Sequence, residues 1–124
     1  MVTGAVWWYA LHAGLGAVLD EGLGAVQQRH AECGRLLQDG LVGLGLELLV
    51  DNEHRLPQLT TVRVPAGVDE AACRRELLSS YGIEIGSGAG QLAGQVWRIG
   101  CMGHVARRRN VFALLGALEE VLGR

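Results

Sequence analysis

The sequence has 124 residues, 49% of them hydrophobic, which is enough for one domain with a real core and too short for two. Thirteen acidic and eleven basic residues leave a formal charge of −2, so a large phosphate-binding surface and a nucleic acid partner are not expected. All eleven basic residues are arginines. Without a lysine, this polypeptide cannot form a lysine Schiff base or use a lysine as a general base.

The cysteines and the uncharged amino-terminal segment indicate whether the chain is secreted or inserted in a membrane. Cys33, Cys73 and Cys101 are odd in number and widely spaced, which predicts buried, reduced thiols rather than a disulfide framework or a zinc ribbon. Residues 1–19 carry no charge, but they contain His12 and three glycines, and no basic residue precedes them. We therefore expect a partly buried helix there rather than a membrane span or a signal peptide.

The first half of the chain predicts two helices followed by two strands. Residues 9–21 form the first expected helix, with Leu11, Leu15, Val18 and Leu19 on its inner side. The second expected helix runs from Leu23 and ends at Gly40, with apolar residues at three- and four-residue spacing. Residues 46–50 and 59–64 have the length and composition of strands.

The second half predicts a helix, two strands and a last helix. Asp69 is placed to cap a helix that reaches Tyr81 and stops at Gly82. Residues 83–85 and 96–101 are expected to be strands, and residues 107–122 follow a helical period closely. The order is two helices and then β-β-α-β-β-α. It predicts an α+β domain with a small, mostly antiparallel sheet covered by helices.

Arg98 is the strongest candidate for a functional side chain. Alternation along its strand places Trp97, Ile99 and Cys101 on one face, and Arg98 on the other with Val96 and Gly100. A guanidinium on an open sheet face, beside a glycine that leaves room for a ligand, suits a carboxylate because its planar fork donates two parallel hydrogen bonds. A solvated or ion-paired arginine is the alternative.

Other features favour structural roles. The glycines of residues 86–90 lack the third glycine and the following helix of a dinucleotide-binding loop, so a turn between strands is expected. His30 and Cys33 lie one helical turn apart without a second pair, so no metal site is expected. The arginines at 107–109 sit near the positive end of a helix dipole and are interpreted as a solvated face. A Cys–His catalytic pair remains open from the sequence, because its members meet only in the fold.

From Tyr9 onward the chain resembles the carboxy-terminal small domain of class V, fold-type I, pyridoxal-phosphate aminotransferases, in particular the alanine–glyoxylate and serine–pyruvate group. The resemblance rests on YALHAGLGAVLDEGL, RLPQLTTVRVPAGVD, YGIEIGSG and GQVWRIGCMGHVARRRNV. It implies a dimeric enzyme that moves an amino group from alanine or serine to glyoxylate or pyruvate. It also implies that Arg98, the arginine of the RIG strand, binds the substrate carboxylate.

The resemblance divides the chain into a divergent segment, residues 1–8, and a small domain, residues 9–124, with the large cofactor-binding domain absent. In the family, the Schiff-base lysine and most phosphate ligands belong to that large domain. The family's phosphate-contacting tyrosine and threonine lie just upstream of the match, and Thr3 is too poor a match to take that role. We therefore expect no catalytic, cofactor-binding or metal-binding residue here, and a chain that is inactive alone.

The implied partners are the missing large domain, the second subunit of the dimer and small amino-acid and keto-acid substrates. The expected compartment is the cytoplasm. Peroxisomal members of the family exist, but the ending Leu122-Gly123-Arg124 is not a peroxisomal address. Two alternatives stay open: a non-catalytic α+β module that binds a small molecule or a protein, and a cysteine-dependent enzyme.

Overall fold

The computed structural model describes residues 4–124 and confirms an α+β domain. Three short 3-10 turns, at Asn52–His54, Gly90–Leu92 and Gly103–Val105, connect its longer elements. Those elements are, in chain order, α1 (Gly4–Glu21), α2 (Leu23–Gly43), β1 (Leu59–Arg63), α3 (Glu70–Tyr81), β2 (Gly86–Ser87), β3 (Val96–Gly100) and α4 (Arg108–Leu122).

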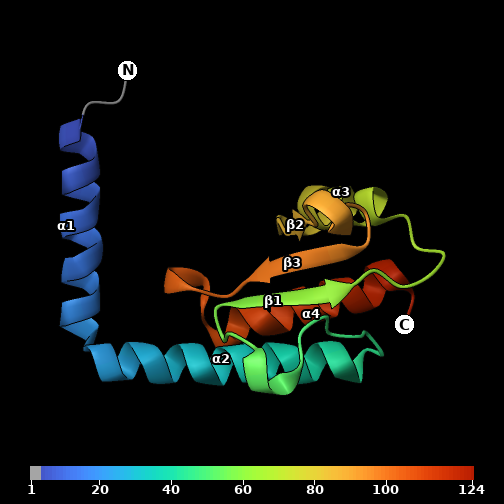
Figure 1. The fold of residues 1–124 in the computed structure, drawn as a ribbon, viewed down its shortest axis with the longest axis horizontal. Coiled ribbons are helices and arrows are strands. Elements are labelled where there is room, and N and C mark those ends of the chain that lie inside the picture. Colours follow the sequence, from blue (N-terminus) through green and yellow to red (C-terminus); the bar gives the residue numbers. More distant parts are fainter. Residues whose placement is uncertain (1–3) are drawn as a thin grey trace.

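The three strands form one antiparallel sheet in the order β1-β3-β2, so β3 is its central strand. The sheet lies over α2 and α4, and α1 extends away from the rest of the molecule (Figure 1). Both pairings share two residues of β3, Trp97 and Arg98, and Arg98 is opposite Thr61 of β1 and Gly86 of β2. The centre of the sheet is therefore the position that the sequence marked as functional.

The core lies between the sheet and the helices. Trp97, Val62, Leu37 and Leu118 are completely or almost completely buried, and they come from β3, β1, α2 and α4. α3 adds Cys73 and Leu77 to the same cluster. This arrangement covers one face of the sheet with helices, and Arg98 and Gly100 of β3, which point the other way, remain exposed.

Glycines set how closely two segments approach α2. A Cβ on Gly34 would lie 2.5 Å from the Pro57 carbonyl oxygen and 2.6 Å from the Pro57 Cα. A Cβ on Gly40 would collide with the Leu115 side chain of α4. The sequence predicted that Gly40 ends the helix, which is wrong: α2 continues to Gly43, and Gly40 is the point where α4 packs against it.

The ends of α3 confirm the sequence prediction in detail. The Asp69 side chain accepts a hydrogen bond from the Ala72 backbone N–H at 3.0 Å, which satisfies one of the free donors at the start of the helix. Gly82 ends the helix with a left-handed φ of 65°, a conformation that costs glycine little.

Two of the four predicted strands are wrong. Residues 46–50 form only an isolated bridge, Leu48 with Val62, and two further backbone hydrogen bonds to β1. Residues 83–85 are not a strand either; β2 begins at Gly86, inside the stretch predicted to be a loop. Both segments are apolar because they border the core, and periodicity does not distinguish a short buried strand from buried irregular chain.

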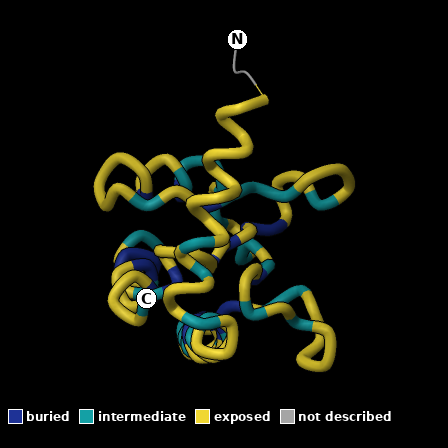
Figure 2. The backbone as a smooth tube through the Cα atoms, turned by 90° about the vertical axis from the view of Figure 1, so that its left-hand side faces the viewer, coloured by how far each residue is buried: buried dark blue, intermediate teal, exposed yellow. Residues whose placement is uncertain are grey.

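α1 also differs from the prediction. No residue of this helix is buried, and the side expected to face inward is exposed, with Leu11 at 51%, Leu15 at 54% and Leu19 at 78% (Figure 2). The helix begins at Gly4, so residues 4–8 of the predicted divergent segment belong to it; Thr3 lies outside the described residues. Among residues 4–124, no helix is both long and apolar enough to span a membrane.

Candidate functional site

Arg98 lies in the middle of β3, and its side chain is exposed, whereas Trp97 and Ile99 on either side are buried. The strand alternation predicted from the sequence therefore places Arg98 on the face away from the helices, as expected. Val96 departs from that pattern because it is 1% exposed. The loop at Gly88 covers it: a Cβ on Gly88 would lie 2.8 Å from a Val96 methyl group.

One hydrogen bond holds the Arg98 side chain. Its Nε–H donates to the Ser87 backbone oxygen at 2.8 Å, and within residues 4–124 its other N–H groups have no protein partner. The nearest strand position on that side is Gly86, whose missing side chain leaves the guanidinium room. The result is an exposed cation with free donors, which is the chemistry that binds a carboxylate.

Towards the end of β3, the neighbours of Arg98 on this face are small or apolar. Gly100 follows two residues later and is exposed, and a Cβ there would lie 3.5 Å from the terminal methyl group of Met102. Leu59, opposite Gly100 in the sheet, is 41% exposed. The same face also carries the exposed Arg63, opposite Val96, but that arginine is paired with Glu47 at 3.1 Å. Arg98 is therefore a positive charge with space beside it and an apolar group at one end.

A network at the joint of α1 and α2 was not found from the sequence. Arg29 donates to both carboxylate oxygens of Glu21 at 3.0 Å and to the backbone oxygens of Gly103 and Ala106 at 2.8 and 2.9 Å. These hydrogen bonds lower the pKa of Glu21. Because Gly103 and Ala106 follow β3, the network ties the base of α1 to the end of the strand that carries Arg98.

His30 has a structural role in the same region. Its Nδ1 lies 2.7 Å from the Val26 oxygen, and its Nε2 accepts a hydrogen bond from the Gly103 N–H at 3.0 Å. A ring that donates from Nδ1 and accepts at Nε2 is the neutral tautomer with both nitrogens occupied. His30 is thus neither a metal ligand nor a general base as it stands. No cluster of metal-binding side chains occurs among residues 4–124.

The three cysteines are buried, as predicted, and unpaired in the described chain. Burial raises the pKa of Cys73 and of Cys101, which keeps both thiols protonated and weakens them as nucleophiles. The hydrogen bonds of His30 leave it no nitrogen free to activate Cys33. These features argue against the cysteine-dependent enzyme.

One partly buried ion pair lies within α3. Arg74 donates two hydrogen bonds to Glu70, at 2.8 and 3.1 Å, and so lowers the pKa of that carboxyl. The Trp97 indole N–H, which is completely buried, also helps to lower it, although the geometry falls short of a hydrogen bond. Because both residues belong to α3 and lie four positions apart, the pair stabilises the first turns of that helix.

The arginines at 107–109 lie where the sequence placed them, at the start of α4. Arg108 and Arg109 are exposed, and Arg108 lies over the Phe112 ring with its guanidinium carbon 5.9 Å from the ring centre. In the glycine loop, only Gly90 has a positive φ, and a short 3-10 turn follows instead of a helix that could hold a phosphate.

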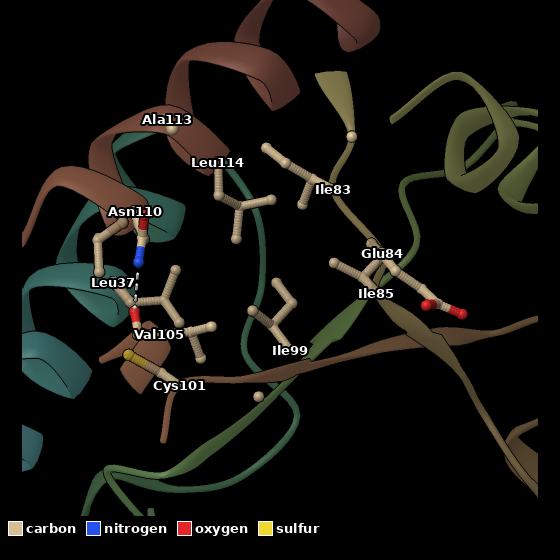
Figure 3. Close-up of a pocket in the computed structure, with 13 residues that line it drawn as sticks. Leu37, Ile83, Glu84, Ile85, Ile99, Cys101, Val105, Asn110, Ala113 and Leu114 are labelled. Carbon is tan, nitrogen blue, oxygen red and sulfur yellow. Dashed lines mark hydrogen bonds between the residues drawn. The ribbon is translucent and has the colours of Figure 1, made fainter. Parts of the chain in front are cut away.

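A cavity of about 290 Å³ lies on the opposite face of β3 from Arg98, between the chain at Ile83 and Ile85 and the start of α4 (Figure 3). Apolar side chains form most of its wall, and the Glu84 carboxylate points away from it. Asn110, a polar lining residue, already donates to the Val105 oxygen at 3.1 Å. The cavity therefore has no charge for a carboxylate ligand.

The chain is similar to known proteins of one family. No protein-family model matches the chain. It is 43% identical over 116 residues to (S)-ureidoglycine–glyoxylate transaminase of Bacillus subtilis, and 39% identical over 115 residues to alanine–glyoxylate aminotransferase of Drosophila melanogaster. These matches cover 94% and 92% of this chain but only 28% and 29% of the relatives, so the chain spans less than a third of their length.

Crystal structures agree with the sequence matches. The alanine–glyoxylate aminotransferase of Nostoc sp. superposes with a TM-score of 0.88 and 47% identity over 93% of this chain, which is 30% of that protein. The pyridoxamine–pyruvate aminotransferase of Mesorhizobium loti gives a TM-score of 0.83 and 35% identity, over 88% of this chain and 28% of that protein. The fold is thus that of a class V aminotransferase small domain.

Within that class, the chain belongs with the alanine–glyoxylate aminotransferases and their near relatives. The resemblance found in the sequence is therefore confirmed.

Proposed function

We propose that this chain is the small domain of a pyridoxal-phosphate aminotransferase that moves an amino group from alanine or serine to glyoxylate or pyruvate, and that Arg98 binds the substrate carboxylate. The observation that carries the proposal is the exposed Arg98 guanidinium, fixed by the Ser87 oxygen and free of any carboxylate partner in the described chain. Its position at the centre of the open sheet face leaves it available to a ligand from outside the domain.

The names of the relatives support the choice of substrate class. Their amino donors differ, from alanine to ureidoglycine to pyridoxamine, but each name contains glyoxylate or pyruvate. Both of these are small 2-oxo acids, so a carboxylate next to the reacting carbonyl is common to all these reactions. A single arginine that recognises a carboxylate therefore suits this whole group, whatever the amino donor.

The residues of this chain do not fit the cofactor. Pyridoxal phosphate needs a lysine to hold it and to move the substrate proton, and this sequence contains none. The cofactor and its lysine must come from another polypeptide segment. We therefore expect the 124-residue chain alone to be inactive as an aminotransferase, and its own contribution to be the binding and orientation of the carboxylate.

The exposed apolar side of α1 supports a missing partner. Trp8, Leu15 and Leu19 are more than half exposed, and more than two thirds of the length of the relatives lies outside this chain. A contiguous apolar surface of this kind marks an interface. We assign this surface to the large domain, against which α1 would bury its apolar side.

The first experiment is the intact mass of the native protein in its source cells, detected with an antibody raised against α4. A species several times heavier than 13.2 kDa is expected, with the lysine in the additional chain. A species at 13.2 kDa alone would instead favour a non-catalytic binding or interaction module descended from the same family.

The second experiment is Arg98→Lys in the complete enzyme. Lysine keeps the charge but loses the bidentate fork, so the KM for the amino acid and for the 2-oxo acid should each rise on the order of tenfold. Arg109→Lys, which changes an exposed arginine of α4, is the matched control and should leave both values unchanged. Unchanged kinetics for Arg98→Lys would remove Arg98 from the substrate site.

A further inference from the structure

We propose that Gly86 is a positioning residue for Arg98: because no branched side chain stands at this position, the Arg98 Nε–H can reach the Ser87 oxygen, which leaves the two terminal amino groups of the guanidinium for the carboxylate. This inference rests on the function proposed above and specifies how the arginine is presented.

The register of the sheet places Gly86 beside the arginine. Gly86 is directly opposite Arg98 in the β2–β3 pairing, and residues opposite each other on antiparallel strands point to the same face. A Cβ on Gly86 would lie 3.6 Å from the Arg98 Cβ and 3.7 Å from its Nε. The stem of Arg98 therefore lies against the place where a side chain at 86 would be.

The Ser87 oxygen that accepts the hydrogen bond is itself held in place. Ser87 pairs with Trp97 in the sheet, and the Gly88 N–H donates to the Val96 oxygen at 3.1 Å. Gly88 also packs so closely against the Leu92 backbone that a Cβ there would collide with it. The acceptor is thus part of a fixed turn, and it orders a long side chain before any ligand arrives.

This hydrogen bond selects one edge of the guanidinium. A free arginine can present either its terminal edge or the edge that includes Nε to a carboxylate. With the Nε–H donated to Ser87, only the terminal edge can form two parallel hydrogen bonds. Because the arginine is already ordered before the ligand arrives, binding loses less conformational entropy.

The test compares two substitutions at Gly86 in the complete enzyme. Gly86→Ala adds a Cβ whose contacts would be ordinary, at 3.5 to 3.7 Å, and should leave KM near the wild-type value. Gly86→Val adds two methyl groups about 1.5 Å further out, which compete with the guanidinium for the same space. We expect Gly86→Val to raise KM for both substrates roughly tenfold and to change kcat by less than about twofold.

Thr61→Val is the matched control. Thr61 is opposite Arg98 on the other neighbouring strand, so this substitution places the same valine side chain beside Arg98 but away from the Ser87 oxygen. It should leave KM unchanged. An equal rise in KM for Thr61→Val and Gly86→Val would overturn the proposal, because it would indicate a general disturbance of the sheet.

Two further measurements do not depend on turnover, and the first needs only the wild-type enzyme. In NMR spectra, the Arg98 Nε–H should exchange with solvent several times more slowly than the exposed Arg109 Nε–H, because it is hydrogen-bonded. Acetate, an unreactive carboxylate, should bind Gly86→Val more weakly than wild type by the same factor as the change in KM. An Arg98 Nε–H that exchanges as fast as that of Arg109 would overturn the proposal even if Gly86→Val did not fold.

The outcomes separate this inference from the proposed function. If Arg98→Lys raises KM but Gly86→Val does not, Arg98 binds the carboxylate and its positioning by Gly86 is wrong. If Arg98→Lys has no effect, the proposed function itself fails.

Discussion

Gly34→Ala tests the close contact between α2 and the chain at Pro57, which sets where β1 enters the sheet. Gly34 is buried in the middle of α2, and a Cβ there would lie 2.5, 2.6 and 2.8 Å from three atoms of Pro57, two of them backbone. Backbone atoms cannot rotate away, so the two segments must separate. Overpacking of this kind costs roughly 1–3 kcal/mol, and the backbone contacts favour the upper part of that range.

Gly116→Ala supplies the matched control. Gly116 lies in the middle of α4, is exposed, and has no atom within 4 Å of the position of a new Cβ. Both substitutions share a gain of about 1 kcal/mol in helix propensity. We therefore expect Gly116→Ala to stabilise the chain by up to that amount, and Gly34→Ala to destabilise it by about 1–2 kcal/mol after the same gain is subtracted.

The assay is urea denaturation followed by far-ultraviolet circular dichroism, with thermal melting as a second measure. For a chain of this size, each 1 kcal/mol corresponds to roughly 4 °C in Tm. The difference between the two variants isolates the steric contribution, because the propensity gain is common to both. If Gly34→Ala proved as stable as Gly116→Ala, the reasoning about the contact with Pro57 would be refuted.

Three further predictions follow from the site and its surroundings. Arg29 lowers the pKa of Glu21, so the stability that this pair adds is present above the ordinary carboxyl pKa of 4.5 and is lost as the pH falls through the lower pKa of the folded state. Glu21→Gln should therefore be less stable than wild type at pH 7 and equally stable in strong acid. A difference in stability that persists in acid would contradict this. The thiols of Cys73 and Cys101 should react with a disulfide reagent at pH 8 only at the rate of unfolding, measured by absorbance with and without urea, because burial keeps them protonated and covered. The isolated chain should associate through the exposed side of α1, and Leu15→Glu should reduce the mass seen by light scattering; a monomeric wild-type chain would argue against an uncovered interface.

Local chemistry was sufficient to predict several elements correctly. The alternation of β3 identified which of its residues face the helices, and thus placed Arg98 on the open face. The caps of α3, Asp69 and Gly82, act within a few residues of the helix ends that they define. The period of α4 identified its buried side, with Val111, Leu114 and Leu118 inward. In each case the residues that decide the structure are neighbours in the sequence.

The predictions that failed depend on segments distant in the sequence. Residues 46–50 are apolar enough for a strand, but regular pairing needs a partner edge, and β1 offers them only a short contact. Gly86 pairs with Arg98 because of the register of β2 on β3, which no local pattern of glycines indicates. The exposure of α1 likewise depends on what packs against it, since the apolar spacing of a helix is the same whether its partner is present or absent.

The sequence by itself thus determined the class of domain, the absence of a lysine to hold the cofactor, and the face of the sheet on which Arg98 lies. Composition and strand alternation suffice for these because they depend only on which residues are present and in what local order. The tertiary structure alone decided how Arg98 is held, since its acceptor is a backbone oxygen eleven residues away that the folding of the chain brings within 2.8 Å. The tertiary structure also decided that no residue of α1 is buried within residues 4–124, because burial is a property of the whole molecule and not of one helix.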